Sequence, residues 1–227
     1  MPGRLGPASG TETVSQSAPR RADLRLIAEL VTRGGRVLDV GCGDGTLLET
    51  LETEKQVKGQ GIEIRNNRVE ACMRRGLTVI QGDADTDLPD FPDRAFDYVI
   101  LSQALQNMHR PREVLDQLLR IGQRAIVSFP NLGHWRARLT LLWRGRMPIV
   151  ETNGMPRSWY DTPNIHLCTI RDFLLMCETL GITVEEGHAV GRDGSLRRLG
   201  AGTAWETLWT HQAVYVLTRS GRPASGG

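Results

Sequence analysis

The run Val37-Leu38-Asp39-Val40-Gly41-Cys42-Gly43-Asp44-Gly45 contains the residues best suited to hold a small ligand through the backbone. Glycines at alternate positions let a chain turn sharply and approach a ligand that a Cβ atom would exclude. Glu63 follows Gly41 by about 20 residues, the separation at which an acidic side chain accepts hydrogen bonds from ribose hydroxyls. The pattern predicts a site for a ligand containing adenosine, and the alternative is a tight turn without a ligand.

The details of the turn argue against a dinucleotide. The dinucleotide-binding fingerprint has a third glycine at the position that Thr46 occupies here. Asp44 would repel a pyrophosphate. A ligand that has no phosphate and carries a positive sulfonium and an ammonium group suits an acidic turn better.

Strands and helices alternate along the chain and must position this turn. Apolar runs predict strands at residues 36–40, 57–64, 77–80, 96–101, 125–129, 182–185 and 213–218. Between them, apolar residues at helical spacing predict helices, including one that begins at Pro111 and one over residues 171–180. Such an alternation is typical of an α/β fold with a doubly wound, mostly parallel sheet covered by helices on both faces.

Composition divides the chain into three parts. Residues 1–20 and 220–227 are rich in Gly, Pro and Ser, which predicts disordered tails on either side of a single domain at 21–219. Within it, residues 131–168 lack a regular pattern and contain three of the five tryptophans, so we expect an irregular cap or partner-binding segment there.

Charge and cysteine content exclude several classes of protein. A net charge of +2 gives no dense basic field for nucleic acid or an anionic membrane. No apolar run approaches the length of a membrane span, and no signal peptide is recognisable, so we expect a cytoplasmic protein. The four cysteines form no paired spacing of the kind that zinc modules need, so we expect reduced thiols and no metal.

The run from Asp39 to Gly45 resembles the first motif of class I S-adenosylmethionine-dependent methyltransferases. The resemblance implies a Rossmann-like fold of the seven-stranded type and S-adenosylmethionine or S-adenosylhomocysteine as cofactor. It implies that the backbone near Gly41 approaches the methionyl part, that Glu63 binds the ribose, and that Asp83 and the Ala84 amide contact the adenine. The full cofactor-binding set implied is Asp39, Gly41, Cys42, Gly43, Glu63, Ile64, Asp83, Ala84, Ser102 and Gln103. For Asp83 a helix cap is the alternative.

Five runs, at residues 37–45, 79–83, 101–106, 128–135 and 159–166, together resemble the MetW family of bacterial methionine-biosynthesis proteins. This resemblance implies a role beside homoserine O-acyltransferase (MetX) as a protein partner, without establishing methyl transfer. A homodimer is also compatible with the sequence. An active methyltransferase on a small acceptor is the alternative function.

The catalytic residues of such a methyltransferase stay undecided. The acidic-Pro-Pro-aromatic motif of amino-group methyltransferases is missing after the fourth strand. Candidates for a general base are His134, Tyr160, Asp161 and His166, all in the irregular segment. Asp161 and His166 could share a small pocket walled by two aromatic side chains, Trp135 and Trp159.

Two alternatives apply to the same segment. The histidines could satisfy backbone groups in a packed loop, or the segment could be a partner-binding surface, because it is rich in the residue types of interface cores. Its residues of these types are Trp135, Arg136, Arg138, Trp143, Arg144, Arg146, Met147 and Trp159. A third possibility is that Leu139, Leu142 and Trp143 form the face of a helix packed on the sheet.

Overall fold

The computed structural model describes residues 22–148, 150–152, 155–157, 162, 164–200 and 204–219. The predicted tails, 1–20 and 220–227, lie outside these residues. The division of the chain into two tails and one domain therefore stays a prediction.

An eight-stranded sheet in the order β3-β2-β1-β4-β5-β10-β8-β9 forms the centre of the molecule. Its first five strands are parallel, and β10 pairs antiparallel with both β5 and β8. The strands are β1 (Arg36–Val40), β2 (Lys58–Glu63), β3 (Val79–Gln81), β4 (Phe96–Ser102), β5 (Gly122–Pro130), β8 (Ile182–Val190), β9 (Leu196–Arg198) and β10 (Gln212–Arg219). The predicted mostly parallel sheet is confirmed, with one strand more than the predicted seven because β9 pairs with the outer edge of β8.

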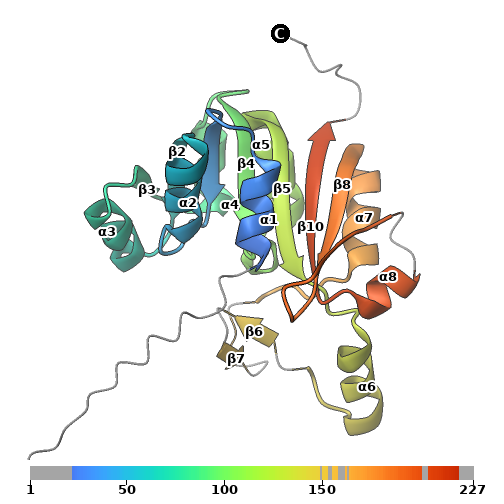
Figure 1. Ribbon diagram of the computed structural model, residues 1–227. Coiled ribbons are helices and arrows are strands. Elements are labelled where there is room, and N and C mark those ends of the chain that lie inside the picture. Colours follow the sequence, from blue (N-terminus) through green and yellow to red (C-terminus); the bar gives the residue numbers. More distant parts are fainter. Residues whose placement is uncertain are drawn as a thin grey trace, which may run out of the picture.

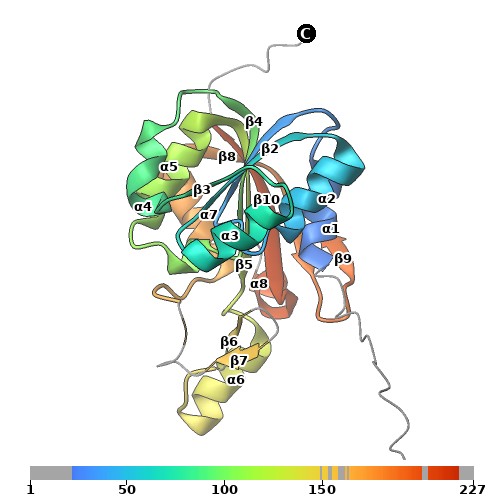
Figure 2. The same ribbon diagram turned by 90° about the vertical axis from the view of Figure 1, so that its left-hand side faces the viewer.

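Helices cover both faces of this sheet, as Figures 1 and 2 show, with α1 and α2 on one face and α4, α5 and α7 on the other. The helices are α1 (Ala22–Leu30), α2 (Thr46–Lys55), α3 (Asn66–Arg74), α4 (Ala84–Asp87), α5 (Pro111–Ile121), α6 (Trp135–Arg144), α7 (Ile170–Thr179) and α8 (Ala204–Trp209), with short 3-10 helices η1 (Leu88–Asp90) and η2 (Leu105–Asn107). The doubly wound α/β fold is confirmed.

Two hydrophobic cores arise because neighbouring residues of a strand point to opposite faces. In β1, Val37 packs with the α1 and α2 side, whereas Leu38 packs with the α5 and α7 side. In β5, Ile126 and Val127 divide in the same way. Alternate side chains of the fully buried strands therefore hold the two helix layers against one rigid sheet.

β8 continues to Val190 instead of residue 185, and two further regions differ from the sequence prediction. β5 begins at Gly122 instead of residue 125. Its first residues are not apolar, but Gly122 and Arg124 pair with Phe96 and Tyr98 of β4. The segment after β5 leaves the sheet: α6 and a small antiparallel hairpin of β6 (Val150–Thr152) and β7 (Met155–Arg157) extend beyond the end of β5 (Figure 1). In the described part of the chain, no helix is both long and apolar enough to span a membrane.

Candidate functional site

The predicted cofactor residues lie at the ends of four neighbouring strands. β3, β2, β1 and β4 are adjacent and parallel, so their carboxyl ends meet at one edge of the sheet. The chain passes from β1 to β2 on one side, and β4 lies on the other side of β1. In doubly wound folds, ligands bind at such a reversal of strand order.

Three glycines shape the turn between β1 and α2. Gly41, Gly43 and Gly45 have φ angles of 72°, 62° and 78°, a region that other residues rarely adopt. A Cβ atom on Gly45 would lie 2.4 Å from Cδ1 of Leu77, so a side chain there is excluded by space as well. The amides of Gly41 and Cys42 donate to the Ile62 carbonyl at 2.8 and 3.2 Å, which ties the turn to the end of β2.

Cys42 contributes its backbone to this turn, not its side chain. Its thiol is buried and packs with Leu48, Cys72 and Leu77 in a separate small core. Burial, together with the nearby Asp39 carboxylate, raises the pKa of the Cys42 thiol far above its ordinary range. A protonated, buried thiol is a poor nucleophile, so the side chain is part of the fold.

Glu63 connects the end of β2 to the glycine turn. Its side chain is only 3% exposed. Oε2 accepts from the Gly43 amide at 3.0 Å, and Oε1 accepts from the Arg65 amide at 3.0 Å. Nε of Arg65 also donates to Oε1 at 3.4 Å, and Nη1 of Arg68 approaches Oε2 to 3.8 Å. A carboxylate has about four acceptor positions, so the two backbone donors leave two positions that hydroxyl groups could take in place of these arginines.

The third strand end supplies Asp83 and Ala84, at the start of α4. Oδ1 of Asp83 accepts from the Asp85 amide at 2.9 Å, the helix cap that the sequence left open as an alternative. The Gly82 amide donates to the Glu63 carbonyl at 3.1 Å, which holds this turn beside the Glu63 turn. Ile64, directly after Glu63, is 59% exposed and offers an apolar surface at the same edge.

The fourth strand end carries Ser102 and Gln103 in an unusual backbone conformation. Gln103 has a φ of 54°, which is uncommon outside glycine and recurs at functional sites. Its amide donates to both the carbonyl and the hydroxyl of Ser128 on β5, at 3.0 and 3.1 Å. The following residue, Ala104, would lie 3.4 Å from a Cβ atom on Gly41. The structure thus brings the Ser102–Gln103 turn next to the glycine turn.

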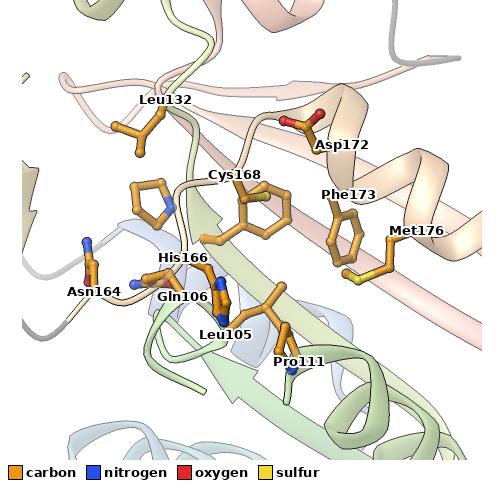
Figure 3. A pocket seen from close by; sticks show the side chains of 12 residues that line it. Leu105, Gln106, Pro111, Leu132, Asn164, His166, Cys168, Asp172, Phe173 and Met176 are labelled. Atoms are coloured by element: carbon orange, nitrogen blue, oxygen red, sulfur yellow. The ribbon is translucent and has the colours of Figure 1, made fainter. Parts of the chain in front are cut away.

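A cavity of about 170 Å³ lies beside this edge, between the end of β5, η2 and α7. His166 lines it, as Figure 3 shows, close to Gln106 and Asn164, while Phe173 and Met176 project from α7 on the opposite side. The complete lining is Leu105, Gln106, Pro111, Phe129, Pro130, Leu132, Asn164, His166, Cys168, Asp172, Phe173 and Met176. It is mostly apolar, and burial raises the pKa of the Cys168 thiol to about 12.

Of the other candidate bases, Asp161 and Tyr160 lie outside the described residues, as does Trp159, and His134 is not part of the cavity lining. His134 caps α6, because its Nδ1 accepts from the Arg136 amide at 3.2 Å. Burial, with the neighbouring His211, lowers the pKa of His134. Trp135, expected to wall the pocket, lies instead against Trp209 of α8 with the ring centroids 6.1 Å apart, and Phe129 and Phe173 supply the aromatic walls.

Two buried polar residues of the region were not predicted. The side chain of Gln106 donates from Nε2 to the Gln103 carbonyl at 2.8 Å. The backbone carbonyl of Gln106 accepts from the amides of Ile165 and His166. Asn131 donates to the carbonyls of Thr207 and Thr210 and accepts from the Gly133 amide. Both belong to runs that resemble the MetW family, but nothing in a single sequence separates a buried amide from an exposed one.

Within the described ranges, no cluster of three or more His, Cys, Asp or Glu side chains could hold a metal ion.

Comparison with known proteins adds to this geometry. The family model described as "Methionine biosynthesis protein MetW" matches residues 21–217. The chain belongs to the MetW family. A bifunctional methionine biosynthesis protein MetXA/MetW of Rhodopirellula baltica is 34% identical over 172 residues, which cover 72% of this chain and 27% of the relative. This MetW family member thus spans about a quarter of the length of that relative.

Several other relatives and solved structures are described as methyltransferases, and a cyclase has a similar fold. A demethylmenaquinone methyltransferase of Renibacterium salmoninarum is 31% identical over 68% of this chain and 73% of its own. The crystal structure of an Archaeoglobus fulgidus SAM-dependent methyltransferase superposes with a TM-score of 0.62 at 17% identity, over 88% of this chain and 92% of its own. The cyclase SpnF superposes with a TM-score of 0.59 at 19% identity, over 86% and 80%. The shared fold therefore does not fix the reaction.

Proposed function

We propose that this chain binds S-adenosylmethionine or S-adenosylhomocysteine at the carboxyl edge of β1 to β4. The observation that carries the proposal is the Glu63 carboxylate. It is buried beside the glycine turn, it is held by two backbone amides, and it keeps the capacity to accept both hydroxyl groups of a ribose. The exposed side chain of Arg65 can move aside to admit the sugar.

The neighbouring turns fit the rest of the nucleoside. Ile64 offers an apolar surface for the adenine, and the Ala84 amide and the second oxygen of Asp83 can pair with its ring edge. On the other side, the turn at Gly41 and Gly43 lets the backbone approach the methionyl part, with Ser102 and Gln103 near the sulfur. Asp39, almost fully buried at the end of β1, supplies negative charge behind a positively charged ligand.

The proposed role is to support homoserine O-acyltransferase in methionine biosynthesis, in the cytoplasm, by forming a complex with it. In the Rhodopirellula relative a MetXA part and a MetW part share one polypeptide, which favours two proteins that work side by side. A nucleoside derived from the end product of this route would report methionine status. It would change the affinity for the enzyme only by as much as it favours one state of the chain.

The test is an acyltransferase assay with the purified enzyme of the same organism, alone and with equimolar full-length chain. We expect the chain to co-elute with the enzyme in size-exclusion chromatography and to change its rate. If the enzyme does not bind the chain and its rate stays the same, with or without S-adenosylmethionine, the proposed role is wrong. The proposal of a nucleoside site does not depend on that result.

Methyl transfer to a small acceptor is the second candidate function, and the cavity beside the edge favours it. An acceptor there would lie beside Gln106, whose Nε2 donates to the Gln103 carbonyl, and His166 lines the wall. The methyl carbon would pass from sulfur to the nucleophile, the electron pair of the broken bond would stay on sulfur, and a base such as His166 would take the proton. Alignment of the two reacting atoms would supply most of the rate.

Two variants separate this function from binding alone. Glu63→Ala should remove both nucleoside binding and any turnover of labelled S-adenosylmethionine, whereas His166→Gln should keep binding and lose turnover. Wild-type turnover in His166→Gln, or turnover that persists in Glu63→Ala, would defeat the second candidate.

A further inference from the structure

Several large apolar side chains on α6 and α8, and directly after α6, are exposed to solvent. We call this region the α6–α8 surface and define it by Leu141, Leu142, Trp143, Met147, Trp205 and Trp209. Leu142 and Trp143 are 75% and 77% exposed, and Trp205 is 68% exposed. None of the ten residues of α6 is buried. The possibility that its apolar face packs on the sheet is therefore wrong.

The exposed side chains form a continuous arrangement. Trp135, at the start of α6, contacts Trp209 at 6.1 Å between ring centroids, and Trp205 stacks on Trp209 at 6.3 Å. Along α6, Leu142 follows Trp135 by seven residues and so lies on the same side of the helix, and Trp143 widens this apolar face by about 100°. Apolar side chains are thus exposed from α8 to the far end of α6, which Figure 1 shows projecting away from the sheet.

The two helices are fixed to each other and to the sheet. Nδ2 of Asn131, at the end of β5, donates to the carbonyls of Thr207 and Thr210 at 2.6 and 2.7 Å, and its Oδ1 accepts from the Gly133 amide at 2.9 Å. Asn131 is 3% exposed, so these bonds are shielded from water. The surface is therefore presented in one arrangement before any partner binds, which lowers the entropy cost of binding.

The charge of the surface determines what can cover it. Residues 135–148 contain four arginines, Arg136, Arg138, Arg144 and Arg146, and no acidic residue. In a symmetric dimer the same patch meets its own copy, which would bring like charges together across α6. A different protein that surrounds an apolar groove with acidic side chains complements both features. Tryptophan and arginine are also the residues that most often dominate binding energy at interfaces.

We infer that the α6–α8 surface is the docking site for homoserine O-acyltransferase, with Leu142 and Trp143 inserted in an apolar groove of that enzyme and the arginines facing its acidic rim. The inference rests on the proposed function, because it takes the partner from there and adds the surface. None of the residues that define the α6–α8 surface belongs to the proposed nucleoside site, so ligand and partner would contact different residues.

Calorimetric titration of the purified acyltransferase into the full-length chain tests this surface. The Leu142→Glu/Trp143→Glu variant places two negative charges in the apolar groove, close to its acidic rim, and we expect affinity to fall by at least about 30-fold. The matched control is Met73→Glu on α3, where a side chain that is 62% exposed lies at the other end of the sheet. We expect the control to bind within about twofold of the wild type.

A second variant and a second readout keep the test decisive if the double glutamate variant folds poorly. Arg144→Ala/Arg146→Ala should weaken binding and reduce its dependence on salt, because fewer charge pairs form. Unchanged affinity in both variants would overturn the docking site while the proposed function stands. A wild-type chain that does not bind the enzyme would remove the proposed function itself. If sedimentation instead shows that the variants lose self-association, a second copy covers the surface and the inference is wrong.

Discussion

The carboxyl edge of β1 to β4 and the α6–α8 surface represent two opposite ways of exposing binding groups. At the edge, Glu63 is 3% exposed and both of its oxygens accept backbone hydrogen bonds. On the α6–α8 surface, Trp143 is 77% exposed, and α6 buries none of its residues. A small polar ligand needs a few groups fixed by the core, whereas a protein partner needs apolar area. The two regions therefore differ in the size of what they bind.

A variant at Glu63 should have the largest effect on ligand binding. Glu63→Ala removes the ribose acceptor and the bond to the Gly43 amide, and we expect affinity for S-adenosylhomocysteine to fall by about 100-fold or more, or about 3 kcal/mol. Calorimetry measures the change. Glu70→Ala, at an exposed glutamate of α3, is the control and should bind like the wild type. A loss of less than about threefold in Glu63→Ala would show that the carboxylate does not hold the ligand.

A variant at Asn131, which connects the end of β5 to α8, should reduce the stability of the fold most. Asn131→Ala leaves the carbonyls of Thr207 and Thr210 without their donor inside the protein, and we expect the free energy of unfolding to fall by about 2 kcal/mol. Denaturant unfolding measures it. Asn66→Ala on exposed α3 loses only a surface hydrogen bond and should change stability by less than about 0.5 kcal/mol. Equal losses in the two variants would contradict the role given to Asn131.

The α6 cap should make stability depend on pH. Burial lowers the pKa of His134 in the folded chain, so the unfolded chain takes up a proton first as the pH falls below about 6.5. Stability is therefore expected to decrease as the pH falls through that region, down to the pKa of the folded state. His134→Asn keeps a capping acceptor without a titrating group, and its melting temperature should vary less between about pH 7 and 5. An identical pH profile for both proteins would exclude His134 as the source.

The smallest effect is expected where the chain exposes most apolar area. Trp143→Ala should change the free energy of unfolding by less than about 0.5 kcal/mol, because the side chain makes few contacts within the fold. Thermal unfolding of the two proteins in parallel measures this. A destabilisation of about 2 kcal/mol would mean that Trp143 packs inside the molecule, and the surface would then have to be redefined.

Much of the fold follows from local patterns. The strands β1, β4 and β5 are nearly continuous apolar runs, and Gly41, Gly43 and Gly45 mark the turn, so a parallel sheet with a ligand edge could be predicted. The outermost strand could not, because β9 exposes all three of its residues and has no apolar face. Only its pairing with β8 makes it a strand.

The finer features of the site depend on contacts between distant residues. The sequence suggests Glu63 as a ribose acceptor, but that it also holds the Gly43 amide follows only from the pairing of β1 with β2. The sequence likewise treats Trp135 as a wall of the pocket, whereas Asn131 brings α8 against the start of α6 and gives Trp135 a different neighbour. Side-chain periodicity does not encode such tertiary hydrogen bonds.

A paired titration of S-adenosylhomocysteine and of the acyltransferase into the same three proteins tests the separation of the two sites most directly. The proteins are the wild type, Glu63→Ala and Leu142→Glu/Trp143→Glu. Without nucleoside present, Glu63→Ala should bind the enzyme like the wild type and lose the nucleoside, and the double variant should do the reverse. Nucleoside binding by Glu63→Ala with wild-type affinity would contradict the account at its centre.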